Sequence, residues 1–258
     1  MAIHPTAIVD PTAKIEQSAE IGPYSIIGGD VEIGARTQIK AHVVMEGPLR
    51  IGQDNVFYPY STIGVPPQDL KYKGERSSTI IGDRNKIREF VTIHRGTEGG
   101  GMRTSLGDDN LLMAYVHVAH DVHIGNHTVL ANAATIGGHV VIGDWAVVSA
   151  GSAVHQFCKV GGHAIIGGYS VITQDVLPYS MTVNEREVKV FGANATGLER
   201  RGFSPESIDA LHKAFRLLTR SGLNTSQAVA RIREEVPPAR EIDELIAFIE
   251  TSKRGVIK

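Results

Sequence analysis

The sequence predicts a mainly β protein, in which a parallel β-helix of hexapeptide repeats precedes a C-terminal α-helical domain. Three observations predict this fold class. An aliphatic residue recurs at every sixth position over most of the 258 residues, glycine often follows that residue, and the spacing becomes helical from Ser204 onward. Fixed self-similarity of this kind is typical of solenoids, in which successive turns of the chain stack on one another.

The repeat starts near the N-terminus and continues, with two interruptions, to Ile172. A period of six matches neither a helix nor an alternating strand. Three hexads make one triangular coil, so residues eighteen positions apart stack in columns about 4.8 Å apart. We expect the aliphatic residues to fill the prism and the glycines to serve corners that need positive φ. The repeating positions are Ile3, Val9, Ile15, Ile21, Ile27, Ile33, Ile39, Met45, Ile51, Phe57, Ile63, Ile81, Ile87, Ile93, Leu106, Leu112, Val118, Ile124, Leu130, Ile136, Ile142, Val148, Val154, Val160, Ile166 and Ile172.

Handedness does not follow from the repeat itself. The usual crossover rule for parallel strands favours a right-handed path. Known hexapeptide-repeat proteins, which this sequence resembles, wind the other way. The resemblance therefore implies a left-handed parallel β-helix.

Two segments interrupt the repeat and are expected to project as loops, where functional residues often lie. The first covers residues 64–80 and leaves the phase intact, so we expect it to replace one whole coil. The second covers residues 95–105, shifts the phase by one and is rich in glycine, which predicts a mobile loop.

The C-terminal part has a different period. Ser204 followed by Pro205 is a typical helix start, and the apolar residues after it have helical spacing. Further helices are expected from Thr225 and after Pro238. We therefore divide the chain into a β-helix, residues 1–183, and a helical domain, residues 184–258.

Composition excludes several classes of function. A formal net charge of -2 provides no excess of positive charge for binding nucleic acid. The N-terminus lacks the features of a signal peptide, and no apolar run is long enough to span a membrane, so we expect a cytoplasmic protein without stable membrane insertion. The single Cys158 fits a reducing compartment and is expected to be a small buried core residue.

Histidines gather in the middle of the repeat. With an eighteen-residue coil, His120, Gly138 and Gln156 share one column, while Asp121 and His139 share the next. A base is thus stacked on a backbone amide that no side chain covers, and such an amide can stabilise an oxyanion. The carboxylate of Asp121 can orient the imidazole, which favours general-base chemistry.

Two other interpretations compete with this one. Histidines outside the prism can simply be solvated. Alternatively, His117, His120, His123 and His127 could bind a metal ion, as in β-helical carbonic anhydrases. These four occupy positions six, three, six and four of the hexad and do not converge within one chain, so we expect no metal and no cofactor.

Several ordered motifs cover nearly the whole chain, helical tail included. They are Gln-Asp-Leu-Lys-Tyr-Lys-Gly-Glu at 68–75, Ile-Arg-Glu at 87–89, Ile-His-Arg-Gly-Thr at 93–97, Met-Ala-Tyr at 113–115, the His117, His120 and Asp121 group, Gly-His at 138–139, His-Gln-Phe-Cys at 155–158, and residues 197–204. Together they resemble the bacterial UDP-N-acetylglucosamine acyltransferases, which perform the first step of lipid A assembly.

The resemblance implies a role for each matching residue. His120 resembles the general base that takes the proton from the sugar 3-hydroxyl, with Asp121 beside it, and the Gly138 amide resembles the oxyanion donor. The remaining matches resemble substrate-binding residues: Gln68, Asp69 and Lys71 on the first loop; His117, His139, His155 and Gln156 in the cleft; Asn194, Arg200 and Arg201 near the nucleotide. Gly168 resembles the residue that limits acyl length.

The resemblance also implies the partners: acyl carrier protein as donor, a UDP-sugar as acceptor, and a homotrimer in which Gln68 reaches a neighbouring subunit's cleft. Two departures concern the nucleotide side. Thr196 stands where the family commonly has an acidic residue, and residues 184–187 replace a family turn. These departures leave a diamino-sugar acceptor, which would give an amide, as one alternative. A hexapeptide transferase that uses acetyl-coenzyme A as its donor is a second alternative.

Overall fold

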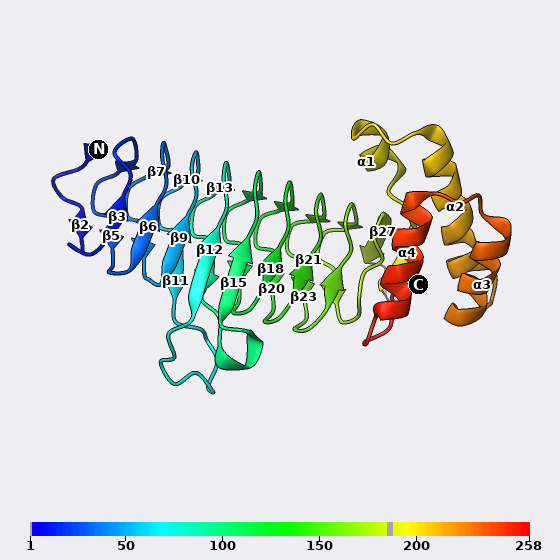
Figure 1. Ribbon diagram of the computed structural model, residues 1–258. Helices are drawn as coiled ribbons and strands as arrows, with labels where there is room; N and C mark the ends of the chain where they lie inside the picture. Colours follow the sequence, from blue (N-terminus) through cyan, green and yellow to red (C-terminus); the bar gives the residue numbers. More distant parts are fainter. Residues whose placement is uncertain (1, 185–187) are drawn as a thin grey trace.

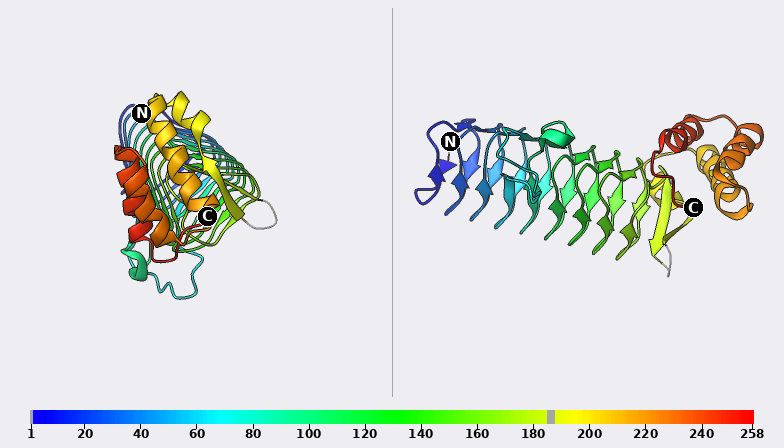
Figure 2. Two further views of the ribbon diagram at one scale, coloured as in Figure 1. Left: turned by 90° about the vertical axis from the view of Figure 1, so that its right-hand side faces the viewer. Right: turned by 90° about the horizontal axis from the view of Figure 1, so that it is seen from below.

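The computed structural model describes residues 2–184 and 188–258. Its main feature is a long three-sided prism, formed by a left-handed parallel β-helix, with the C-terminal helices stacked at one end (Figure 1). In the end-on view of Figure 2 the coils overlie one another behind these helices.

Each side of the prism is a sheet of short strands, and the described residues form three such sheets. Sheet A contains β1 (Ala2–Ile3), β4 (Glu20–Ile21), β7 (Gln38–Ile39), β10 (Val56–Phe57), β13 (Lys86–Ile87), β16 (Leu111–Leu112), β19 (Val129–Leu130), β22 (Val147–Val148), β25 (Ile165–Ile166), β27 (Ser180–Asn184) and β28 (Val188–Ala193). Sheet B contains β2 (Ile8–Val9), β5 (Ile26–Ile27), β8 (Val44–Met45), β11 (Thr62–Val65), β14 (Thr92–His94), β17 (His117–Val118), β20 (Thr135–Ile136), β23 (Ala153–Val154) and β26 (Val171–Ile172). Sheet C contains β3 (Lys14–Ile15), β6 (Val31–Ile33), β9 (Leu49–Ile51), β12 (Ser78–Ile81), β15 (Arg103–Leu106), β18 (His123–Ile124), β21 (Val141–Ile142) and β24 (Lys159–Val160).

The strand register confirms the eighteen-residue coil. Ile3 pairs with Ile21 in sheet A, and His117 pairs with Thr135 in sheet B. The repeating residues face inward, and Phe57 and Leu112 are fully buried. Because the chain passes from sheet A to B, then to C and back to A, the prism has three edges, which we call A–B, B–C and C–A.

The glycine after the repeating aliphatic residue has a different cause from the one expected. Gly22 and Gly34 do not have positive φ. A Cβ on Gly22 would lie 2.7 Å from the carbonyl carbon of Lys40 in the next coil, so glycine lets the backbones of successive coils approach. The left-handed conformation falls two residues later, at non-glycine corners such as Tyr24 and Asp121, with φ of 58° and 59°.

Both interruptions leave the prism at the B–C edge, and the first forms the projecting loop of Figure 1. Across the first, Ile51 pairs with Ile81, a separation of 30 instead of 18. The expectation that this loop replaces a whole coil was therefore wrong, because it lengthens one coil instead. Across the second, Ile93 pairs with Val118, a separation of 25.

The C-terminal part begins on the prism and ends as helices. β27 pairs in parallel with β25 and antiparallel with β28, and it spans the boundary expected at residue 183. The helices are α1 (Ala195–Arg200), α2 (Pro205–Arg220), α3 (Thr225–Glu235) and α4 (Arg240–Thr251). Ser204 caps α2 by accepting a hydrogen bond from the N–H of Ser207, as the sequence predicts. α1 was not expected, because six residues are too few to show a period.

Two observations complete the fold. No helix within residues 2–184 and 188–258 is long and apolar enough to cross a membrane. The segment 184–187 differs from the family pattern in sequence, and its residues 185–187 lie outside the described residues.

Candidate active site

His120 and Asp121 lie in the turn after β17, at the B–C edge. Nδ1 of His120 is 2.8 Å from Oδ2 of Asp121. The Asp121 side chain is fully buried, whereas that of His120 is 14% exposed. With Nδ1–H donating to the carboxylate, Nε2 is left as the proton acceptor. The pair therefore has the geometry of a general base with an orienting carboxylate.

Gly138 lies one coil beyond His120, in the turn after β20. A Cβ at this position would lie 2.8 Å from Nε2 of His120, so the imidazole rests directly against the glycine backbone. Among the described residues, no group accepts a hydrogen bond from the Gly138 N–H. That N–H is available to a ligand beside the base, as an oxyanion donor must be.

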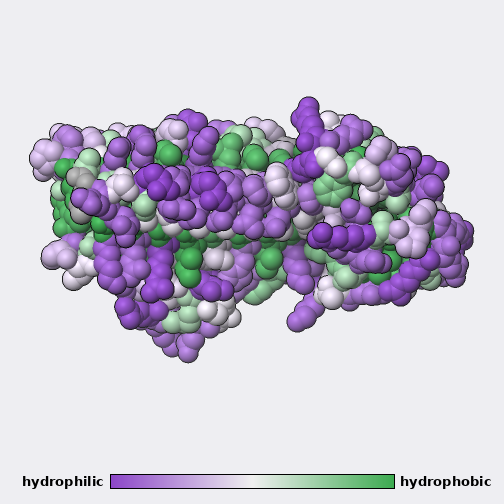
Figure 3. Space-filling view, turned by 45° about the horizontal axis from the view of Figure 1, so that its top comes forward, coloured by the Kyte–Doolittle hydropathy of each residue, from purple (hydrophilic) through white to green (hydrophobic). Residues whose placement is uncertain are grey.

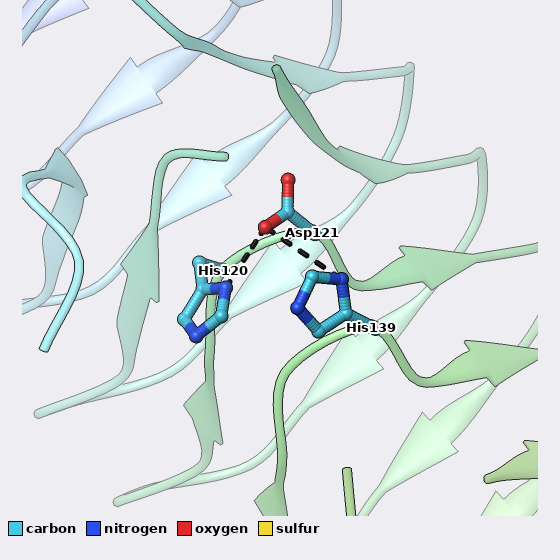
Figure 4. Close-up of side chains that lie close together, drawn as sticks. All are labelled: His120, Asp121 and His139. Carbon is cyan, nitrogen blue, oxygen red and sulfur yellow. Dashed lines mark hydrogen bonds and ion pairs between the residues drawn. The ribbon is translucent and has the colours of Figure 1, made fainter. Parts of the chain in front are cut away.

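His139 completes the group drawn in Figure 4, where both imidazoles lie beside the Asp121 carboxylate. Its ring meets that of His120 edge-on and stacks on Phe157 at 4.4 Å. Burial lowers the pKa of His139, and the charges of Asp121 and Asp69 act in the opposite direction. His139 is therefore largely neutral at physiological pH.

His117 lies three residues before His120, on β17. Its Nδ1 is 2.7 Å from Oγ1 of Thr92, and burial lowers its pKa. Its ring meets His94 edge-on at 4.9 Å. Sequence reasoning assigned His94 no role, yet it is 4% exposed, its Nδ1 has no partner among the described residues, and burial lowers its pKa to about 4. Its sequence signals are its place in the motif at 93–97 and its position directly after Ile93, where the repeat often has glycine.

His155 and Gln156 lie at the same edge, one coil beyond Gly138. Both are exposed. The Gln156 carbonyl accepts a hydrogen bond from Arg254 of the C-terminal segment at 3.1 Å. The predicted column of His120, Gly138 and Gln156 is thus assembled, with its side chains on the outside of the prism.

The loop between β11 and β12 brings Gln68, Asp69 and Lys71 to the B–C edge as well. Asp69 Oδ1 accepts the Lys71 N–H at 2.9 Å, and its charge reaches His139. Gln68 and Lys71 are exposed, and Leu70 between them is 105% exposed. The loop therefore contributes polar groups to the site but leaves a leucine fully in solvent.

The other predicted residues lie at different edges. Gly168 follows β25 at the A–B edge. Asn194 donates to the His163 carbonyl at 3.0 Å, and Arg201 donates to the Trp145 carbonyl at 3.0 Å, both at the C–A edge. Arg200 and Thr196 are exposed on α1. One chain thus does not bring these residues to His120.

The four histidines weighed as metal ligands do not converge. His123 lies 2.8 Å from Ser105 Oγ, and His127 stacks on Trp145 at 4.1 Å at the C–A edge. His120, Asp121 and His139 do place ligand atoms within 4.8 Å of one another. Oδ2 of Asp121 is already hydrogen-bonded, at 2.8 Å to His120 and at 2.5 Å to the hydroxyl of Thr97. We therefore interpret the cluster as a network that orients the imidazole of His120.

A histidine and carboxylate pair beside an uncovered amide on a hexapeptide β-helix defines the class of hexapeptide-repeat acyltransferases. The family pattern "Bacterial transferase hexapeptide (six repeats)" matches residues 12–47 and 103–138, and "Udp N-acetylglucosamine O-acyltransferase; Domain 2" matches residues 175–257. The acyl-[acyl-carrier-protein]–UDP-N-acetylglucosamine O-acyltransferase of Thermodesulfovibrio yellowstonii is 47% identical over 256 residues, covering 99% of each chain. The chain belongs to the family of UDP-N-acetylglucosamine O-acyltransferases.

Solved structures agree with this membership. The UDP-N-acetylglucosamine acyltransferase of Bacteroides fragilis superposes with a TM-score of 0.95 at 42% identity, over 99% of each chain. That of Francisella novicida superposes with a TM-score of 0.94 at 39% identity, over 99% of this chain and 93% of that one. The likeness includes the helical domain as well as the repeat.

Proposed function

We propose that the protein transfers a 3-hydroxyacyl group from acyl carrier protein to the 3-hydroxyl of UDP-N-acetylglucosamine, the first step of lipid A biosynthesis. The observation that carries this proposal is the His120 imidazole, bonded to a buried Asp121 and resting against the Gly138 backbone. The donor and acceptor are those in the name of the 47% identical relative, which favours ester formation over the diamino-sugar and acetyl-coenzyme A alternatives.

In this reaction Nε2 of His120 removes the proton from the sugar 3-hydroxyl while that oxygen attacks the thioester carbonyl carbon. The carbonyl oxygen gains negative charge, which the Gly138 N–H stabilises. The C–S bond then breaks, the ester forms, and the departing thiolate of the carrier takes the proton from His120. Asp121 stabilises the imidazolium between these two proton transfers.

The positions of the side chains support the substrate-binding roles that the family resemblance implies. Asp69 and Lys71 on the first loop, with His117, His139, His155 and Gln156 beside the base, would hold the sugar and the thioester. The guanidinium groups of Arg200 and Arg201 suit the phosphates of the nucleotide, since a planar donor fork binds phosphate in a bidentate manner. Asn194 is the N-cap residue at the start of α1, and the two arginines lie at the end of the same helix.

A homotrimer would unite residues that one chain keeps apart. Gly168 and the pair Asn194 and Arg201 lie at the two edges that border sheet A, while His120 lies at the opposite edge. A second copy whose sheet A faces the B–C edge of the first would bring all of them to one cleft. That contact would also cover the exposed Leu70 and place Gln68 against the neighbour.

Exposed apolar surface also supports assembly. Rings stack along the A–B edge at spacings of 4.9 to 5.1 Å, and most of them are about half exposed: Tyr24, His42, Tyr60, Phe90 and Tyr115. The face in Figure 3 shows hydrophobic patches along the prism between hydrophilic rows. Monomers rarely expose long apolar strips of this kind.

The proposal also covers the cellular compartment and the need for metals or cofactors. The single Cys158 is free and buried, which fits a cytoplasmic protein, and the reaction needs no metal, cofactor, nucleic acid or membrane insertion. Stoichiometric zinc in active purified protein, lost together with activity on chelation, would contradict the metal-free mechanism.

The proposed activity is tested by incubating the purified protein with 3-hydroxyacyl-acyl carrier protein and UDP-N-acetylglucosamine, and identifying the product by mass spectrometry. Parallel reactions replace the acceptor by its 3-amino analogue or the donor by acetyl-coenzyme A. We expect an ester on the 3-hydroxyl from the first pair at a rate well above both alternatives. A faster amide-forming reaction, or no transfer from the carrier protein, would overturn the proposal.

A further inference from the structure

The second projecting loop closes over the carboxylate of Asp121. Thr97 donates to both oxygens of that carboxylate: its N–H to Oδ1 at 2.8 Å and its hydroxyl to Oδ2 at 2.5 Å. Thr97 is 6% exposed and Asp121 is 2% exposed, so water does not compete for these bonds. One residue from a loop outside the repeat thus holds both oxygens of the carboxylate beside the base.

The same loop also covers Asp121 through Gly100. A Cβ on Gly100 would lie 1.9 Å from the Cγ of Asp121, whereas a Cβ on the adjacent Gly99 would meet nothing within 4 Å. Only glycine at position 100 therefore lets the loop lie flat on the carboxylate. Thr104, at the end of the loop, accepts the Asp121 N–H at 2.8 Å and fixes the backbone as well.

This loop is attached to the loop that carries Asp69 and Lys71. The N–H of Glu98 donates to Oε1 of Glu75 at 3.2 Å. Because Glu98 follows Thr97, the contact also restrains the segment that holds Asp121. The two interruptions of the repeat are thus joined beside the catalytic pair.

We infer that Thr97 is a positioning residue for acyl transfer, fixing the Asp121 carboxylate in the rotamer that bonds Nδ1 of His120. A carboxylate can turn about its terminal side-chain bond, since such torsions have broad minima. Two hydrogen bonds to a charged, buried acceptor restrict that rotation. Thr97 thereby acts through Asp121 on the orientation of the base. The inference rests on the proposed roles of His120 and Asp121.

Thr97→Val removes the hydroxyl while keeping the shape and the backbone N–H. We expect kcat to fall by roughly tenfold, with KM for donor and acceptor changed by less than about twofold, because an orienting contact acts on the chemical step. Thr97→Ser should restore most of the activity. Thr37→Val is the matched control: the hydroxyl of Thr37 is also buried and hydrogen-bonded, at 2.9 Å to Gly52, but far from Asp121, so kcat should stay at the wild-type value.

Gly100→Ala and Gly99→Ala form a second matched pair. The first should lower kcat by displacing Asp121, and the second should not. Comparable losses in both variants would attribute the effect to the loop in general and overturn the inference. Wild-type kcat in both Thr97→Val and Gly100→Ala proteins would overturn it too.

A double-mutant cycle separates positioning from a merely structural role. In an Asp121→Ala background Thr97 has no carboxylate to hold, so Thr97→Val should lower the single-turnover rate no further. Equal fold losses in the presence and absence of Asp121 would contradict the inference. If Thr97→Val and His120→Ala proteins both kept full activity, the proposed function itself would fail. If Thr97→Val kept full activity while His120→Ala lost it, only the inference about Thr97 would fail.

Discussion

Gly138 presents its bare backbone to the imidazole of His120: a Cβ on Gly138 would lie 2.7 Å from Cε1 of that ring. Any larger residue would push the imidazole away from the position in which Asp121 holds it. The same contact leaves the Gly138 N–H beside Nε2. The requirement for glycine and the proposed oxyanion site therefore have one structural cause.

The first prediction follows from this contact. Gly138→Ala should lower kcat by roughly 100-fold, because it displaces the base and crowds the oxyanion position. Gly192→Ala is the matched control, since a Cβ there meets nothing within 4 Å, and it should retain normal turnover. Circular dichroism would show that both proteins are folded. Normal turnover in a folded Gly138→Ala protein would exclude this role.

The second prediction concerns acyl length. A Cβ on Gly168 would meet only the Ala150 carbonyl, at 3.4 Å, so a side chain fits there without moving the prism. Wild-type protein should prefer long 3-hydroxyacyl donors, because each buried methylene contributes about 0.8 kcal/mol. Gly168→Met should prefer markedly shorter ones. Rates measured over a series of donor lengths would check this, and identical profiles would place the length-limiting residue elsewhere, such as Tyr169.

The third prediction concerns the seam between subunits. Mixed oligomers of His120→Ala and Arg200→Ala chains should be more active than either parent, at an acceptor concentration below KM. Each mixed trimer contains one cleft in which the Arg200→Ala chain supplies an intact His120 and the His120→Ala chain supplies an intact Arg200. Light scattering should give the mass of a trimer. An active monomer, or mixed oligomers with only the mean activity of their parents, would refute a shared cleft.

The fourth prediction concerns pH. Burial lowers the pKa of His94 and of His163 to about 4, from an ordinary value of 6.5. Between these two values the unfolded chain binds protons that the folded chain does not, so stability falls as pH drops from 6.5 toward 4. Below both values these groups add no further change.

This pH dependence can be assigned with a variant. The His163 ring stacks between Trp145 and Tyr179, and its Nδ1 has no partner among the described residues, so phenylalanine should replace it without loss of packing. In His163→Phe the melting temperature should fall less steeply with acid than in wild type. The exposed His4 is the control, and His4→Phe should follow the wild-type curve. Parallel curves for all three proteins would contradict the assignment.

Much of this fold could be predicted because one residue in every six must be buried inside the prism. Inward positions such as Phe57 and Leu112 must be apolar in every coil, so the repeat, the coil length and the columns above His120 are visible in the sequence. The recurrence of glycine after the aliphatic residue, as at Gly22, was visible too, but its cause was not. Close approach of the backbones of successive coils and a positive φ both select glycine.

Other features depend on contacts without a period. Thr97 meets Asp121 across 24 positions, from a loop that has left the repeat, so no spacing rule connects them. The buried state of His94 likewise depends on a neighbouring coil, whose His117 meets its ring edge-on at 4.9 Å. The distance of Gly168 and Arg201 from His120 could not be predicted, because it depends on which edge of the prism each turn occupies. The lengths of the two loops determine those edges.

The measurement that tests the central claim most directly is the single-turnover rate of acyl transfer in His120→Ala protein. The protein should stay folded, because His120 lies outside the apolar core, and its affinity for UDP-N-acetylglucosamine should change less than its turnover. Its rate from 3-hydroxyacyl-acyl carrier protein should be lower by at least roughly 100-fold, the usual contribution of a general base. A folded His120→Ala protein that transfers the acyl group within about twofold of the wild-type rate would contradict general-base catalysis at this site.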